Sequence, residues 1–271
     1  MSTKRIQFVV AYDGTDFCGW AAQAGRRTVQ GTLKEAVRQV SGEDCEIIGA
    51  SRTDSGAHAR GQVCHFDTEV RIDPSVWPRA INRILPPEVR VVRAKVVPDS
   101  FHSRFCARDR WYRYSVLVGE PDPFRARFAH DLYRPLDLRS MQDAAKALVG
   151  RHDYRAYTEE LDKRTENTMR DMRSVSVTQV HDEVRIDIVG TAFLRGMMRR
   201  MSGALVEVGR GKRAIESVEA LLGEDGMQMV RPASRMPSTC PEASARVAAR
   251  TGSSGSRVPT HRDRLSRAAE Q

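Results

Sequence analysis

The order of apolar segments in the first half of the chain constrains the fold more than any other feature of the sequence. Apolar residues alternate from Ile6 to Tyr12, which predicts a strand, and a stripe at helical spacing, including Leu33 and Val37, lies between Thr28 and Gly42. The same reasoning predicts six segments, namely strand 4–14, helix 28–42, strand 45–50, strand 61–70, helix 74–85 and strand 88–97. This order is that of the ferredoxin-like, split βαβ arrangement.

The second half begins in the same way and then departs from the pattern. The predicted segments are strand 111–119, helix 138–150, strands 172–180 and 183–190, and helices 193–211 and 213–223. A closing strand should follow, but residues 232–271 contain no Phe, Trp, Tyr or Ile and only one Leu. Such a composition buries too little apolar surface to offset the ordering of the chain. We therefore interpret 232–271 as a disordered or aberrant tail.

These segments predict an α+β protein with two ferredoxin-like halves, residues 1–107 and 108–231. We expect the halves to form a mainly antiparallel sheet with helices on one side and a catalytic cleft, and to lack the closing C-terminal strand. The 271 residues are enough for this arrangement, and the 40% of hydrophobic residues fits a globular protein.

The charge of the chain favours a polyanionic partner. The formal net charge is +9 and the sequence pI is about 9.7, which is typical of proteins that bind nucleic acid. No apolar run predicts a signal peptide or a membrane span, so we expect a cytoplasmic protein without a membrane partner.

The five cysteines predict neither disulfides nor zinc binding, because their number is odd and no two form a CxxC pair. His58, Cys64 and His65 are close in sequence, but neighbouring residues of a strand point to opposite faces. We therefore expect no metal site.

One loop carries the residues best suited to chemistry. The stretch GASRTDSGAHARGQVCHF, residues 49–66, places Asp54 between an apolar run and a small-residue turn. Thr-Asp-Ser-Gly suits a β-turn in which the aspartate caps backbone amides. An ionised carboxylate in such a loop also suits catalysis, and the local sequence leaves both interpretations open.

The wider pattern resembles a known family. SRTDSGAHARGQVCHF is similar to the active-site stretch of the TruA-type tRNA pseudouridine synthases. The segments AYDGTDFCGW, RTVQGTL, FHSRFCARDRWYRYSV, GRHDYRAY, TMRDM and FLRGMMRRMSGALVEVGRGK resemble further landmarks of that family, in the family's order. The resemblance covers residues 6 to 222.

The resemblance implies a site and a reaction. Asp54 matches the essential aspartate, and Arg199 matches an arginine that pairs with it. Tyr112 matches a tyrosine that stacks on the target base and can take the C5 proton, whereas Tyr114 better fits the core. Arg52 matches an arginine that contacts RNA or displaces the base, and His58 is a further substrate-binding candidate. Exposed loop cations that could contact RNA are Arg26, Arg27, Arg60, Lys163 and Arg164.

The implied reaction is the conversion of uridine to pseudouridine at positions 38, 39 and 40 of the tRNA anticodon arm. The glycosidic bond breaks, the base rotates and C5 joins the ribose, without a cofactor or metal. Attack of the carboxylate on the sugar, attack on the base and proton abstraction all remain open. The resemblance also implies a homodimer. The alternatives are an RNA-binding homologue impaired by its altered C-terminus and a plain ferredoxin-like binding module.

Overall fold

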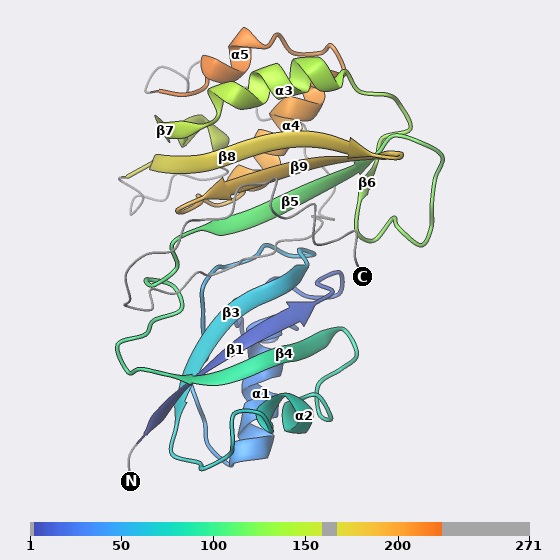
Figure 1. Cartoon of the computed structure of the whole chain (residues 1–271). Coiled ribbons are helices and arrows are strands. Elements are labelled where there is room, and N and C mark those ends of the chain that lie inside the picture. Colours follow the sequence, from blue (N-terminus) through green and yellow to red (C-terminus); the bar gives the residue numbers. More distant parts are fainter. Residues whose placement is uncertain (1–2, 159–166, 224–271) are drawn as a thin grey trace, which may run out of the picture.

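The computed structural model describes residues 3–158 and 167–223. Figure 1 shows two sheets, one in each half of the chain, with α1 and α2 beside the first and α3 to α5 beside the second. The first half contains β1 (Lys4–Tyr12), α1 (Val29–Ser41), β2 (Ile48–Gly49), β3 (Ala59–Thr68), α2 (Trp77–Ile81) and β4 (Val89–Val97). The second contains β5 (Arg110–Leu117), β6 (His130–Asp131), α3 (Leu138–Ala147), β7 (Gly150–Asp153), the 3-10 helix η1 (Arg155–Tyr157), β8 (Met169–Val180), β9 (Glu183–Gly190), α4 (Met197–Gly209) and α5 (Glu216–Glu219).

The first sheet has the strand order β2-β3-β1-β4, and all its pairs are antiparallel. Helix α1 begins and ends where its sequence predicts. The Thr28 side chain accepts a hydrogen bond from the Gly31 N–H, and Gly42 ends the helix at φ 74°. Its apolar stripe, including Leu33 and Val37, is buried against the sheet.

Helix α2 is shorter than the predicted helix 74–85. The Asn82 side chain donates to the Val91 carbonyl (2.9 Å) and accepts from the Val91 N–H (2.8 Å), which fastens the end of α2 to β4. Trp77 at the start of α2 is fully buried and packs edge-on against Phe8 and Phe66 of the sheet. Aromatic packing therefore seats this short helix on the sheet.

The second sheet has the order β6-β5-β9-β8-β7, with β6 parallel to β5 and the other pairs antiparallel. The strands β6 and β7 are not predicted by the sequence, because their residues, HD and GRHD, include no apolar run or alternation. The strand predicted over 45–50 is also shortened, to the two residues of β2. Helix α5 has four residues where the sequence predicts a helix over 213–223. Helix α3 begins after Asp137, whose side chain accepts from the Ser140 N–H.

The expectation of one mainly antiparallel sheet is wrong for the described residues. The two halves form separate sheets, and neither edge of one sheet pairs with an edge of the other. The halves meet through loops and side chains instead, and Ala57 of the first half packs in the core of the second. The predicted tail, 232–271, lies outside the described residues. None of the described helices has the length and apolarity that a membrane span requires.

Candidate active site

The loop that carries Asp54 connects β2 to β3 and is fixed on both sides of that residue. The Asp54 carbonyl accepts from the Ala57 N–H (3.1 Å), which closes a turn, and the Thr53 carbonyl accepts from the Trp20 N–H (3.1 Å). The Thr53 and Tyr12 hydroxyls share a buried hydrogen bond of 2.8 Å. Burial raises the pKa of the Tyr12 phenol, so that group stays protonated.

Two glycines in the segment after β1 allow this loop to approach closely. A Cβ on Gly14 would lie 1.9 Å from the Ala57 carbonyl oxygen. Gly19 has φ +84°, and a Cβ there would lie 2.7 Å from the Thr53 carbonyl oxygen. The backbone of residues 13–19 therefore supports the loop directly from one side.

The Asp54 side chain faces an arginine from the other half of the chain. The Arg199 Nε lies 3.4 Å from Asp54 Oδ2, and the two side chains are 23% and 38% exposed, so the pair is open to solvent on one side. Arg199 lies in the first turn of α4, whose Met197 and Met201 are fully buried. The apolar face of α4 thus turns Arg199 toward the loop. The Asp54 backbone thus closes the turn, and the Asp54 side chain forms the ion pair.

Tyr112 lies on β5, opposite Ile188 of β9. Its ring is half-buried and packs edge-on against Phe193, with ring centroids 4.7 Å apart. It lies near enough to Tyr12 to interact electrostatically with that buried phenol, which itself bonds to Thr53 beside Asp54. Tyr112 is therefore close to the loop. Tyr114, two residues on, is buried in the core as predicted.

Arg110, at the start of β5, joins both halves at this site, and our sequence reasoning did not identify it. Its guanidinium donates to the Ser51 hydroxyl (3.1 Å) and the Ala50 carbonyl (3.1 Å) of the loop. It also donates to the carbonyls of Thr191 and Arg104. Burial lowers the pKa of the guanidinium. A signal was available, since Arg110 directly precedes the predicted strand 111–119, where a long side chain is well placed to reach the neighbouring half.

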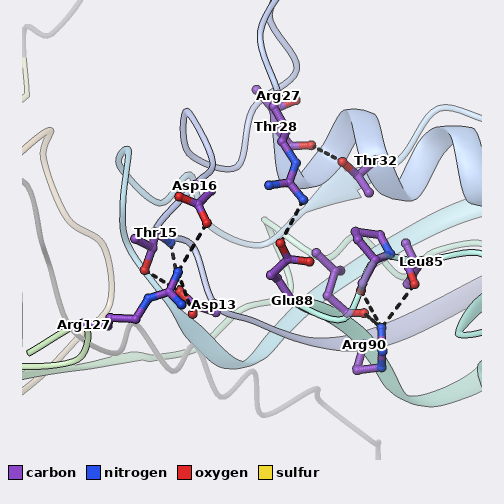
Figure 2. A network of polar contacts seen from close by, with 12 residues as sticks. Asp13, Thr15, Asp16, Arg27, Thr28, Thr32, Leu85, Glu88, Arg90 and Arg127 are labelled. Carbon is purple, nitrogen blue, oxygen red and sulfur yellow. Dashed lines mark hydrogen bonds and ion pairs between the residues drawn. The ribbon is translucent and has the colours of Figure 1, made fainter. Parts of the chain in front are cut away.

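His58 lies inside the junction between the halves rather than on an open surface. It is 3% exposed. Its Nδ1 accepts from the Gly14 N–H (3.1 Å), and its Nε2–H donates to the Arg127 carbonyl (2.9 Å). Figure 2 shows Arg127 reaching Asp13 and Asp16, at 3.7 and 3.3 Å. These contacts fit a residue that holds the two halves together, and the burial argues against the predicted direct contact with substrate.

The predicted RNA-binding cations are spread over the surface. Arg52 follows Ser51 in the loop and is exposed, and Arg60 is exposed at the start of β3. Arg26 and Arg27 line an open groove of about 370 Å³ beside α1. Arg27 also pairs with Glu88 at 3.2 Å, as Figure 2 shows, and covers the Phe17 ring. Lys163 and Arg164 lie outside the described residues.

These features form a carboxylate-centred candidate active site at the junction of two α/β halves, on a strongly basic protein. The family model described as tRNA pseudouridine synthase matches residues 8–106 and 144–243, which include Asp54 and Arg199. The chain belongs to this family.

Curated relatives agree with this assignment. Proteins named tRNA pseudouridine synthase A are 38% identical in Syntrophotalea carbinolica (80% of this chain, 86% of the relative) and 42% identical in Brevibacillus brevis (78% and 86%). A third, from Moorella thermoacetica, is 35% identical over 88% of this chain and 97% of the relative. A solved Cbf5-Nop10-Gar1 complex matches with a TM-score of 0.28 and 8% identity, covering 74% of this chain and 54% of that chain, and supports no argument.

Proposed function

We propose that this protein is an isomerase that converts uridine to pseudouridine in the anticodon arm of tRNA, at positions 38, 39 and 40. The observation that carries the proposal is the Asp54–Arg199 pair, formed by two residues that lie far apart in a chain matched by the tRNA pseudouridine synthase family. Relatives that share 35–42% of their residues with this chain are named tRNA pseudouridine synthase A.

The proposal gives each residue a part in the reaction. Asp54 is the essential carboxylate, and Arg199 keeps it charged and directed toward the ribose or the base. Tyr112 offers an aromatic face to the displaced base and a hydroxyl that can accept the C5 proton. Arg52 is exposed in the same loop and is suited to displacing the base from its stack.

We infer that the two halves, residues 1–107 and 108–231, are ferredoxin-like units. The first-half strand order β2-β3-β1-β4, with α1 after β1 and α2 after β3, supports this. In the second half, β5, α3, β8, β9 and α4 repeat that succession, and β5-β9-β8 repeat the pairing. A fourth strand of this unit would lie beside β5, where β6 contributes two residues.

The family resemblance further implies a homodimer that acts in the cytoplasm and holds one tRNA with both subunits. The net charge of +9 suits phosphate contacts, because each neutralised phosphate releases counterions. Light scattering on the purified chain, with and without tRNA, measures the oligomeric state. A monomer under both conditions would contradict the dimer.

The decisive experiment follows tritium release from C5-labelled tRNA. The wild-type protein should release tritium and form pseudouridine. We expect Asp54→Asn to abolish turnover and to change tRNA affinity by less than roughly tenfold, about 1.4 kcal/mol, because the amide keeps the shape but is neither a nucleophile nor a base. Pseudouridine formed by the pure variant would refute the catalytic role of Asp54.

The same assay separates this proposal from its main alternative, a catalytically impaired RNA-binding homologue. That homologue would bind tRNA and release no tritium. The comparisons do not favour it, since the family match continues to residue 243. Absence of turnover by the wild-type chain, together with tight tRNA binding, would establish the alternative.

A further inference from the structure

Phe105 presents an aromatic ring to solvent next to the active site. The residue is 78% exposed and lies in the connection between β4 and β5. Its neighbours Arg104 and Arg108 are also exposed. Arginines interleaved with an exposed aromatic ring are suited to unpaired nucleic acid, in which every base has a face that can stack.

The backbone that carries Phe105 is held by several hydrogen bonds. The Nδ1 of His102 accepts from the N–H groups of Arg104 (3.2 Å) and Phe105 (3.3 Å). Ser103, which is fully buried, donates its N–H to Nδ1 of His65 (3.2 Å). These hydrogen bonds fix the position of Phe105, so its ring is exposed on a backbone that is held in place.

The His102 ring supports the Phe105 ring from one side. The two ring centroids are 4.3 Å apart and the planes are inclined by 31°. The His102 ring in turn packs against His65 of β3, with centroids 5.0 Å apart. Phe105 is the outermost member of this stack, which limits its motion and leaves its outer surface for a further planar group.

The stack stands beside the loop that carries Asp54. Arg110 donates both to the Arg104 carbonyl and to the Ala50 carbonyl of the loop. Cys106 packs against the small apolar cluster that contains Ala50. Arg104 and Cys106, on the two sides of Phe105, are therefore linked to the segment that leads into Ser51 and Asp54, the first through Arg110 and the second through the apolar cluster.

We propose that Phe105, supported by His102, is a stacking platform for an unpaired base that neighbours the target uridine. This inference rests on the proposed function, and it adds a binding position for a second nucleotide. The platform holds the strand while the target base is turned toward Asp54. Removing a base–aromatic stack weakens binding by about fivefold to 150-fold.

Kinetic measurements on four variants test the platform with the full chain and an anticodon-arm RNA. We expect Phe105→Ala and Phe105→Leu to raise KM by at least roughly fivefold, and Phe105→Trp to restore it, because only an aromatic ring stacks. Phe124→Ala is the matched control, since Phe124 is also an exposed aromatic, at 89%, on a different loop. Wild-type KM in Phe105→Ala, or full rescue by Leu, would overturn the proposal.

Fluorescence of 2-aminopurine gives a readout that a merely structural role would not change. The probe is placed at one loop position of the RNA at a time. We expect one position to be quenched by wild type and by Phe105→Trp and to stay bright with Phe105→Ala. If no probe position depends on Phe105, the inference is wrong. A change of oligomeric state in Phe105→Ala, measured by light scattering, would also overturn it and would show that Phe105 contacts protein instead. Turnover by the wild-type chain tests the proposed function separately.

Discussion

At the scale of single residues, Asp54 has a structural role through its backbone and a proposed chemical role through its side chain. Asp54 closes a turn with its carbonyl and faces Arg199 with its carboxylate. The turn places the carboxylate, and the arginine from the other half directs it. The turn role and the proposed catalytic role therefore fall to the same residue, and neither interpretation of the loop excludes the other.

Replacement of Tyr112 by phenylalanine separates the ring from its hydroxyl. Tyr112→Phe should keep the edge-on packing against Phe193, so we expect tRNA binding to change by less than roughly tenfold. If the hydroxyl takes the C5 proton, the variant should cleave the glycosidic bond and release little tritium. Tritium release measures the loss of the C5 proton, and the base composition after quenching measures cleavage of the glycosidic bond. Wild-type rates would leave stacking as the only role of Tyr112.

At the scale of elements, the active-site loop depends on the segment that follows β1. Gly14 of that segment and Arg110 of β5 both contact the loop, and His58, within the loop, bonds to Gly14 and to the Arg127 carbonyl. The loop is held by tertiary contacts more than by its own turn.

Substitution of Gly14 tests this support. Gly14→Ala places a Cβ 1.9 Å from the Ala57 carbonyl oxygen, so the loop or β1 must move. We expect the free energy of unfolding to decrease by about 1–3 kcal/mol. Each kcal/mol lowers Tm by roughly 2–4 °C. We also expect a lower turnover. Thermal unfolding followed by circular dichroism measures the shift. The control is Gly25→Asn, because Gly25 has φ +67° and no atom within 4 Å of an added Cβ. Equal Tm values for the two variants would contradict the close contact.

At the scale of the whole molecule, histidines in both halves connect stability to pH, two of them buried and one half-buried. Burial lowers the pKa of His58, His65 and His130, and that of His65 falls to about 4. The ionisable groups that face them are Asp13 and Arg127 for His58, Arg5, His102 and Asp67 for His65, and Asp131 and Arg210 for His130. Burial, with the nearby Arg5 and His102, lowers the pKa of His65, and the neutral ring accepts a hydrogen bond from the Ser103 N–H at Nδ1.

The sign of the pH effect follows from these shifts. The unfolded chain binds more protons than the folded chain between the lowered pKa values and about 6.5. The contribution to stability is therefore complete above pH 6.5 and is lost as the pH falls toward 4. Carboxylates whose pKa is lowered by arginine, such as Asp67 beside Arg5, lose their contribution only below about pH 4.

Urea unfolding at pH 7, 6 and 5 measures this dependence. We expect the free energy of unfolding to decrease as the pH is lowered, by at most about 1.4 kcal/mol per pH unit for each histidine. His65→Gln should be less stable at pH 7, because it loses the contacts to Ser103, but should show a shallower slope. A midpoint that stays constant from pH 7 to pH 5 would contradict neutral buried histidines.

The sequence determined what depends on neighbouring residues. Thr28 and Gly42 fix the ends of α1, and β9 spans the predicted residues 183–190, because a cap or a strand period is complete within a short segment. The ordered family-like segments likewise singled out Asp54, Arg199 and Tyr112 as the candidate site, and the comparisons confirmed the family.

The tertiary structure decided what depends on residues far apart in the chain. The halves form two sheets, since neither edge of one pairs with the other, and β6 exists only because it lies against β5. The burial of His58 and the four hydrogen-bond acceptors of Arg110 follow from how the halves pack. The exposed position of Phe105 follows from the contacts of its own loop with His65 of β3. Local periodicity records which face of an element is apolar. It does not indicate which other element covers that face. The packing of the two halves against each other, which brings Arg199 to Asp54, therefore appears only in the tertiary structure.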